Sequence, residues 1–462
     1  MCVLKIVIAG SGKVGFTLAE HLSREQHDVT IIDTKYDALK RASDTLDVMC
    51  VKGNGASSAV LEEVGTANAD VVIATTGMDE INMVCGQVAK RMGAKYVIAR
   101  IRSTEYISDV AFLKRDLGID MVINPEHAAA TEISRLLRLP AAANIETFYH
   151  GRVELIGFRL QADDFVVGKT LAALKLHDIG ILFCAVERGK EVFIPNGNSQ
   201  LLEGDMVYII GEPLGISRFF KELGRYVPKM RNIFIIGGGR ITQYLIPLLG
   251  KLGKHTKIVE SDEVRCRQLA EIFPQSLIVH GDGTDQELLE SEDMQNNDAL
   301  VALTGLDEYN LVISLYAMQQ GVPKVVAKTN RENYISIARS IGLDSVVSPK
   351  QTTANHILKI VRGMQNSKGS VMTGLYRIAN DQAEAMEFVV NHTTRYLNTP
   401  LKDLKLKKGI LIAVIVHNNR IIIPEGSTRI EAGDTVIIVS RDSGILDIND
   451  IYADSPAGGG KE

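Results

Sequence analysis

The 462-residue sequence has no excess of basic residues and no long apolar run. Lysine and arginine total 51 against 56 aspartates and glutamates, so the electrostatic attraction that nucleic-acid binding requires is missing. No uninterrupted apolar stretch approaches about 18 residues, which argues against a membrane-spanning helix. The N-terminus also lacks the charged-then-apolar pattern of a signal peptide. We therefore expect a soluble globular protein that stays in the cytoplasm.

Cysteine is scarce, and its arrangement excludes a disulfide framework. The five cysteines are scattered, with no CxxC pair, which favours a reducing compartment. None of the ten histidines is spaced with Cys, Asp or Glu as metal ligands are, so we predict no metal site. His127 beside Glu126 is the strongest acid–base candidate. Both follow Pro125 at a predicted helix start, where polar residues are common without function, and we predict no catalytic residue.

What the sequence does contain is organised around residues 4–33, LKIVIAGSGKVGFTLAEHLSREQHDVTIID. The apolar run at its start predicts a strand buried on both faces, and a helix is predicted after the spacing GxGxxG. Gly10 allows a tight turn, Gly12 lets a phosphate approach the backbone, and Gly15 lets the helix pack close to the strand. The N-terminus of that helix directs free N–H groups and a positive dipole end at an anion.

An acidic residue ends the next strand. Asp33 lies 18 residues after Gly15, where its carboxylate can accept hydrogen bonds from both ribose hydroxyls. A 2′-phosphate there would meet a like charge, so the expected ligand is NAD(H) or an adenine nucleotide rather than NADP(H). An ordinary strand-to-helix turn followed by a surface aspartate is the alternative interpretation.

Strands and helices alternate as far as residue 123, which predicts a parallel, doubly wound sheet with right-handed crossovers. Ligands bind at the carboxyl ends of such strands. Four polar residues end predicted strands at the rim that holds the glycine loop: Asn54, Thr75, Thr76 and Arg100. Arg100 could neutralise phosphates, or it could form a rim salt bridge with Asp79 or Glu80.

The chain matches itself when it is shifted by about 228 residues. VIAGSGKVG aligns with FIIGGGRIT, VTIID with TKIVE, VKGNGASSAVLEEV with VHGDGTDQELLES, and VVIATTGMDEINM with LVALTGLDEYNLV. Glu260 then takes the place of Asp33, and Lys328 that of Arg100. Both halves therefore carry a complete dinucleotide-type unit.

The second glycine loop is an imperfect copy. Gly237 and Gly239 keep the first two glycines, but Thr242 stands at the third. The helix must therefore lie slightly farther out or use a different packing contact. Arg240 could add positive charge near a phosphate, or it could be solvated. We expect the second site to be weaker or to prefer a different nucleotide.

A smaller domain follows each of these units. Residues 151–211 and 384–440 read as short strands with one helix, and Gly189 marks a hairpin turn. The predicted fold class is α/β, with two Rossmann-like doubly wound parallel-sheet domains, each followed by a small α+β domain. The predicted domains are residues 1–140, 145–222, 230–365 and 374–453. Linkers are expected near 140–144, 224–229 and 366–374, and a disordered tail at the C-terminus.

With its four units in this order, the chain resembles the tandem regulator-of-potassium-conductance (RCK/KTN) family. The resemblance spans all but the tail and rests on GSGKVG, GGGRIT, the GNG and GDG loops, TTGMDEIN, LTGLDEYN, and the EGD and AGD strand starts. It implies a cytoplasmic, peripheral and non-catalytic regulatory subunit that binds NAD(H) or ATP/ADP. It also implies assembly as a ring, expected to be a homotetramer, beneath the membrane potassium-translocating subunit of a Trk-type system.

The resemblance also implies which residues line the two sites. The first nucleotide would contact Gly10, Ser11, Gly12, Lys13, Val14, Asp33, Thr75, Thr76 and Arg100, and Asn54 joins this set as a rim residue. The second would contact Gly237, Gly238, Gly239, Arg240, Ile241 and Glu260, and Asp282, Thr304 and Lys328 join it by position in the repeat.

Two alternatives to this interpretation stay open. An NAD-dependent oxidoreductase would also use the glycine loop, although the small domains are too short to enclose a substrate beside the nucleotide. A nucleotide-sensing scaffold for a non-potassium transporter fits the sequence as well. The sequence leaves open which nucleotide activates and the number of subunits.

Overall fold

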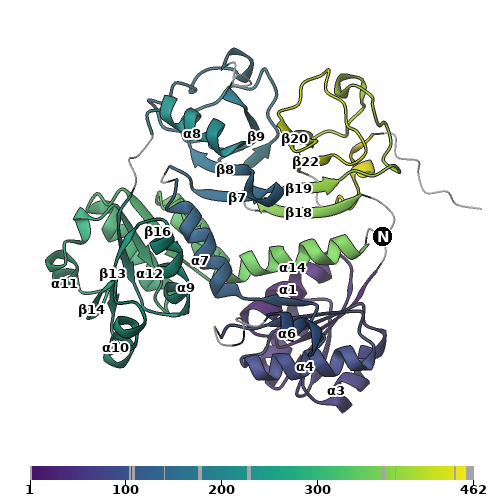
Figure 1. The fold of residues 1–462 in the computed structure, drawn as a ribbon, viewed down its shortest axis with the longest axis vertical. Helices are drawn as coiled ribbons and strands as arrows, with labels where there is room; N and C mark the ends of the chain where they lie inside the picture. The colour runs from purple at the N-terminus through teal and green to yellow at the C-terminus, as the bar shows by residue number, and fades with distance from the viewer. Residues whose placement is uncertain are drawn as a thin grey trace, which may run out of the picture. The chain divides into compact units, whose positions relative to one another are not determined.

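The computed structural model describes residues 3–103, 106, 110–139, 141–174, 179–225, 230–365, 370–379, 381–441 and 444–453. The chain forms two compact units, each built from two separate stretches of sequence. Unit 1 comprises Met1–Ser134 with Arg231–Val361, and unit 2 comprises Arg135–Met230 with Arg362–Glu462. The units therefore group residues by type of sheet rather than by order along the chain, as the colours in Figure 1 show.

The first half of unit 1 is a parallel sheet of six described strands in the order β3-β2-β1-β4-β5-β6. This order is that of a Rossmann fold. The central strands β1 and β4 are almost completely buried, because helices cover both faces. The elements are β1 (Lys5–Ala9), α1 (Lys13–Arg24), β2 (Asp28–Asp33), α2 (Tyr36–Thr45), β3 (Met49–Lys52), α3 (Ser58–Glu63), β4 (Val71–Ala74), α4 (Asp79–Met92), β5 (Tyr96–Arg100), α6 (Val110–Arg115), β6 (Met121–Ile123) and α7 (Pro125–Leu136).

The second half of unit 1 repeats this sheet, with the described strands in the order β14-β13-β12-β15-β16-β17. Parallel pairing of β12 with both β13 and β15 confirms the internal duplication. The elements are β12 (Asn232–Ile236), α9 (Arg240–Lys251), β13 (His255–Glu260), α10 (Glu263–Ile272), β14 (Leu277–His280), α11 (Gln286–Ser291), β15 (Ala299–Ala302), α12 (Asp307–Gln319), β16 (Lys324–Lys328), α13 (Glu332–Ser340), β17 (Val346–Val347) and α14 (Pro349–Gln365).

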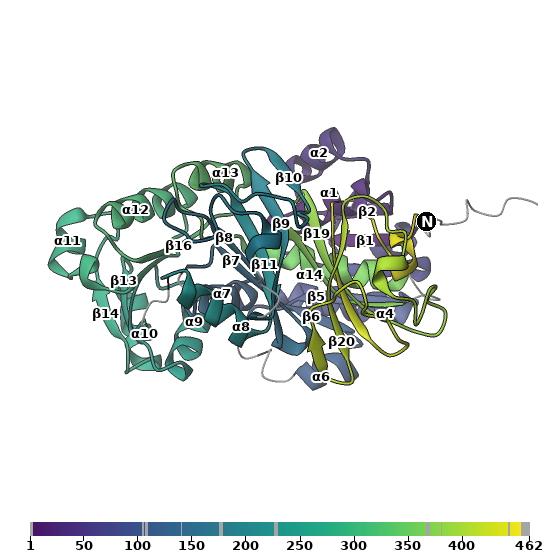
Figure 2. The same ribbon diagram turned by 90° about the horizontal axis from the view of Figure 1, so that it is seen from above.

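Unit 2 contains two antiparallel sheets, in the strand orders β10-β9-β11-β8-β7 and β18-β19-β22-β20-β21. Side chains from both sheets form one core, in which the Ala379 N–H donates a 3.0 Å hydrogen bond to the Tyr208 hydroxyl. Figure 2 gives a second view of these strands. The elements are β7 (Asn144–Phe148), β8 (Val153–Arg159), β9 (Ile181–Arg188), β10 (Glu191–Phe193), β11 (Met206–Gly211), α8 (Pro213–Glu222), β18 (Val371–Ile378), β19 (Ala383–Val389), β20 (Ile410–His417), β21 (Arg420–Ile422) and β22 (Thr435–Ser440).

The outer strands β7 and β18 were not expected from the sequence. β18 begins at Val371, inside the stretch expected to be a linker, and β7 begins at Asn144, the last residue of another. Each pairs antiparallel with the first predicted strand of its small domain. The expected tail, the linker at 226–229 and the start of the helix expected at 107–117 lie outside the described residues.

An ion pair lies in each half of unit 2, but only the pair of the second half is fully buried. Arg362, at the C-terminal end of α14, binds Glu384 in a bidentate manner, with N–O distances of 2.8 and 3.0 Å. The two side chains are 1% and 3% exposed. The matching pair in the first half joins Arg138 to Glu154, but the Arg138 side chain is 43% exposed. The two halves thus use the same ionic contact at different depths.

Candidate functional site

The first glycine loop has the geometry that phosphate binding requires. Gly10 has φ +105°, and a Cβ there would lie 2.8 Å from the Thr76 nitrogen, so only glycine fits this turn. No described atom lies within 4 Å of a Cβ built on Gly12, which leaves the backbone open to an approaching group. Gly12 is also the N-cap of α1, and it supplies no side-chain cap to the helix N–H groups. These N–H groups are therefore available to an anion.

The Asp33 carboxylate holds this loop from the end of β2. Its Oδ2 accepts the Ser11 N–H at 2.7 Å, and its Oδ1 accepts the Lys35 N–H at 2.8 Å. Each carboxylate oxygen has a second lone pair, which can accept a ribose hydroxyl. The residues present therefore fit the phosphate and the ribose of a nucleotide, which Gly12 and Asp33 would contact.

The other predicted rim residues lie at the ends of β4 and β5. Thr75 is buried and its hydroxyl donates to the Gly10 carbonyl at 3.2 Å, so it supports the loop from below. The Thr76 N–H and hydroxyl both donate to Asn82 Oδ1, at 2.8 and 2.7 Å. Asn82 in turn donates to the Arg100 carbonyl at 2.8 Å. This asparagine, which the repeat alignment also marks, fixes the spacing between the two strand ends.

Among the described contacts, Arg100 does not form the salt bridge with Asp79 or Glu80 that was the alternative to phosphate binding. One of its Nη atoms donates to the Thr76 carbonyl, and its buried Nε has no hydrogen-bond partner in the described part of the chain. Burial, and after it the neighbouring Arg102 guanidinium, lowers the pKa of Arg100 below its usual value. An anion at the rim would relieve both effects.

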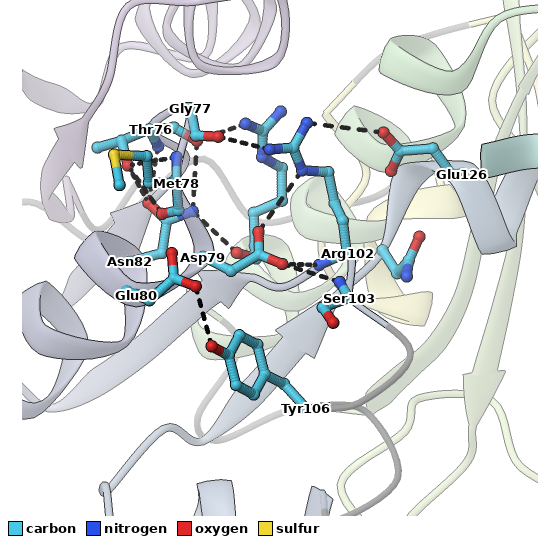
Figure 3. A network of polar contacts seen from close by, with 12 residues as sticks. Thr76, Gly77, Met78, Asp79, Glu80, Asn82, Arg102, Ser103, Tyr106 and Glu126 are labelled. Carbon is cyan, nitrogen blue, oxygen red and sulfur yellow. Dashed lines mark hydrogen bonds and ion pairs between the residues drawn. The ribbon is translucent and has the colours of Figure 1, made fainter. Parts of the chain in front are cut away.

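Arg102, rather than Arg100, pairs with Asp79, and sequence reasoning missed it. Figure 3 shows the contacts: Asp79 Oδ2 accepts the Arg102 and Ser103 N–H groups, both at 2.8 Å. Arg102 Nε lies 3.5 Å from Asp79 Oδ1, and its Nη2 donates to the Gly77 carbonyl at 2.5 Å. The position of Asp79 at the start of α4 is the sequence signal that could have indicated this role.

The second glycine loop has the same backbone arrangement, and the longer side chain of Glu260 takes the place of Asp33. Gly237 has φ +99°, and Gly239 is the N-cap of α9 without a side-chain cap. Glu260 Oε2 accepts the Gly238 N–H at 2.6 Å, and Oε1 accepts the Asp262 N–H at 3.0 Å. Arg265 Nε donates to the Gly238 carbonyl at 3.0 Å. The second loop is thus held from both sides.

Thr242 is accommodated by an exchange of side chains between two elements. In the first half, a Cβ on Gly15 would lie 1.9 Å from the Gly10 carbonyl oxygen and 2.9 Å from the Thr75 hydroxyl. In the second half, Leu303 follows β15 where Thr75 follows β4, and the Thr242 hydroxyl donates to the Gly237 carbonyl at 2.5 Å. The hydroxyl has moved from the strand end to the helix. The expected different packing contact is therefore this hydrogen bond.

The remaining candidates of both halves are at their expected strand ends. The Lys328 Nζ donates to the Thr304 carbonyl at 2.5 Å, and burial lowers the pKa of Lys328. Asn54 and Asp282 use their side-chain oxygens within their own turns, accepting from Ala56 N–H at 3.0 Å and Thr284 N–H at 2.9 Å. These two contribute to loop shape in the structure.

A polar pocket of about 400 Å³ lies where the rim of the first half meets α9 of the second half within unit 1. Its cationic lining residues are Arg102 and Arg240. Glu126 Oε1 lies 4.0 Å from Arg102 Nη1, and His127 packs edge-on against the Tyr244 ring at 5.4 Å. The pair considered as an acid–base candidate therefore contributes to this contact region.

No helix in the described ranges is long and apolar enough to span a bilayer. Within the same ranges, no three His, Cys, Asp or Glu side chains gather as metal ligands would.

Comparison with known proteins identifies the family. The sequence model of the TrkA-N domain family matches residues 6–125 and 233–349. The sequence model of the TrkA-C domain family matches residues 155–224 and 385–452. The chain is 35% identical over 459 residues to the Trk system potassium uptake protein TrkA homolog 1 of Methanosarcina mazei, covering 97% of this chain and all of that one. It is 33% identical over 457 residues to homolog 2 of the same organism, with the same coverage.

Solved structures share the fold at low identity. A structure of the GsuK channel bound to NAD superposes with a TM-score of 0.63 at 18% identity, covering 95% of this chain and 77% of that one. A structure of GsuK bound to ADP gives a TM-score of 0.51 at 16% identity, covering 78% and 69%. The duplicated domains and the full-length relatives together show that the chain belongs to the TrkA family of Trk system potassium uptake proteins, a non-catalytic regulatory family.

Proposed function

We propose that this protein is a cytoplasmic, peripheral regulatory subunit that binds NAD(H) or ATP/ADP and controls a membrane potassium-translocating subunit of a Trk-type system. The observation that carries the proposal is the pair of open glycine loops, each held by a strand-terminal carboxylate. The names of the full-length relatives support potassium uptake, and the NAD and ADP complexes of GsuK support the ligand class.

Regulation requires that the nucleotide distinguish two arrangements of the protein. A ligand with equal affinity for both arrangements shifts neither population. The polar pocket offers a way to distinguish the two arrangements, because it holds Arg102 from the first half and Arg240 from the second. The phosphates of a nucleotide on the first loop could reach Arg100 or Arg102. A nucleotide that engages both halves would favour the arrangement in which they are close.

We expect Asp33→Ala to weaken binding of ADP and of NAD at the first site by roughly ten- to a hundredfold. Hydrogen bonds to a charged partner contribute about 1.5–3 kcal/mol, and the ribose would lose its carboxylate acceptor. Isothermal titration of the full chain measures the change. Asp44→Ala, which removes an exposed carboxylate on α2, is the matched control. Unchanged affinity in Asp33→Ala would refute the assignment of this site.

Control of transport needs a separate measurement. Potassium flux into vesicles that contain the membrane subunit should depend on whether ATP, ADP, NAD or NADH is added with this protein. Identical flux with all four would refute nucleotide control. A change in NADH absorbance would instead favour the oxidoreductase alternative: NADH would form from NAD as a candidate hydroxy acid is oxidised, or would be consumed as a candidate aldehyde is reduced.

We also propose that the apolar faces of unit 1 assemble copies of the chain into a homotetrameric ring. Val312 on α12 is 63% exposed, and five more large apolar residues around it are exposed. These are Leu306, Tyr309, Leu315, Ile337 and Ile341. The first half exposes Val84 and Phe112, which line an apolar groove. Exposed apolar surface of this kind is typical of an interface.

We therefore expect Val312→Asp to shift the protein to smaller species in light scattering coupled to size exclusion, because a buried unpaired carboxylate would destabilise the interface. Leu214→Asp on α8, where the native leucine is 71% exposed, should leave the assembly unchanged. A wild-type monomer at micromolar concentration would contradict the ring.

A further inference from the structure

One side chain of the second half reaches directly into the rim of the first half. The Tyr244 hydroxyl donates to the Arg102 carbonyl at 2.7 Å and accepts from Asn124 Nδ2 at 2.9 Å. Asn124 Oδ1 in turn accepts the His127 N–H at 2.8 Å. Tyr244 is therefore fixed by two hydrogen bonds and by the His127 ring.

Tyr244 belongs to the helix whose N-terminus forms the second glycine loop. α9 begins at Arg240, directly after Gly239, so Tyr244 lies about one turn from the N–H groups that would face a phosphate. A helix of this length moves as a rigid element. An anion that anchors the start of α9 therefore also fixes the position of the Tyr244 hydroxyl.

In the first half, Arg102 connects the Tyr244 hydrogen bond to the first nucleotide site. Its carbonyl accepts from Tyr244, and its guanidinium donates to the Gly77 carbonyl in the loop that follows Thr76. The Thr76 nitrogen lies against Gly10. A short chain of contacts thus leads from the second glycine loop to the first.

The Tyr244 contact has no counterpart at the matching position of α1 among the described contacts. Thr17 stands on α1 where Tyr244 stands on α9, and this buried threonine makes no described polar contact with the second half. Asn330 stands where Arg102 does, and its side chain donates to Asp307 at 3.1 Å. The Tyr244 contact is therefore formed on one side only, and α1 meets the second half instead where His21 Nε2 lies 3.5 Å from Gln351 Nε2 on α14.

We propose that Tyr244 is a positioning residue through which nucleotide at the second site tightens nucleotide binding at the first. This rests on the proposed function, since it requires both loops to bind nucleotide. The physical reason is preorganisation: with α9 anchored, the rim held by Arg102 is already ordered when the first nucleotide arrives. Couplings of this kind typically change affinity about five- to 150-fold, and the effect on the two sites is reciprocal.

A double-mutant cycle on the full chain tests the proposal, with ADP as the probe in isothermal titration. Because Asp33→Ala weakens the first site, the binding that remains in this variant identifies the isotherm of the second site. In the parent protein, Glu260→Ala should weaken first-site ADP binding by about fivefold or more. In Tyr244→Phe, which loses only the hydroxyl, Glu260→Ala should have no further effect on first-site affinity.

Tyr316→Phe is the matched control, because it removes a hydroxyl that bonds Glu290 at 2.7 Å, away from both glycine loops. It should retain the full effect of Glu260→Ala. Persistence of the effect in Tyr244→Phe, or its absence from the parent protein, would overturn the coupling while two ADP molecules still bind. If the parent protein binds no ADP, the proposed function and the coupling are both wrong.

Discussion

Replacing Arg362 by methionine should destabilise unit 2 by about 3–5 kcal/mol, because it leaves the Glu384 carboxylate buried without its bidentate partner. Both side chains are almost completely buried, so water cannot replace the guanidinium. Arg377 Nε, 3.4 Å from Glu384 Oε1, compensates in part and places the expected loss at the lower end of this range. Circular dichroism in urea measures the change, and it suits a chain without tryptophan.

The matching ion pair in the first half of unit 2 supplies the control for this experiment. Arg138→Met removes the matching guanidinium from Glu154, but the Arg138 side chain is 43% exposed, so solvent can take its place and the loss should be smaller. The double variant Arg362→Met, Glu384→Leu should recover most of the lost stability, since it removes both charges together. Equal losses for Arg362→Met and Arg138→Met would contradict the role of burial.

The second large effect is expected at the third glycine of the first loop. Gly15→Thr should abolish ADP binding at the first site and destabilise the first half by roughly 1–3 kcal/mol, because the added Cβ would overlap the Gly10 carbonyl oxygen. The introduced hydroxyl would also compete with Thr75 for the same carbonyl acceptor. Titration with ADP and thermal unfolding measure the two effects.

The second half indicates how this damage can be repaired. Adding Thr75→Leu to Gly15→Thr recreates the Thr242 and Leu303 combination, in which one hydroxyl serves the first glycine carbonyl. The double variant Gly15→Thr, Thr75→Leu should therefore recover part of the lost stability and part of the lost ADP affinity. Thr75→Leu alone should cost less than Gly15→Thr, because it loses one hydrogen bond without a backbone overlap. A double variant no better than Gly15→Thr would contradict the exchange.

Much of the fold was predictable, because local pattern and topology agree. The parallel, doubly wound sheet expected as far as residue 123 forms in the first half, since buried parallel strands produce apolar runs separated by helices. The glycine loop was predictable for a stronger reason: Gly10 and Gly237 both have positive φ, and each lies against the end of a neighbouring strand, β4 or β15. Only glycine tolerates this backbone conformation and close approach, so the spacing of the glycines in the sequence indicates the loop.

The strands and side chains that sequence reasoning missed have a common cause. β7 and β18 carry polar residues and lie at sheet edges, so neither shows the apolar run of a central strand. Tyr244 contacts Arg102 across 142 positions of sequence, and neither residue belongs to a motif. Contacts of this kind depend on tertiary packing. The placement of the predicted nucleotide contacts stays a prediction until a ligand is bound.

Having both halves on one chain has an evolutionary consequence. In a dimer of identical polypeptides, any substitution occurs twice, and a contact that suits one side must be tolerated on the other. Here Tyr244 and Thr17 occupy matching places and can change independently. A chain that carries both halves can therefore form a contact on one side only, which a symmetric dimer of identical chains cannot encode.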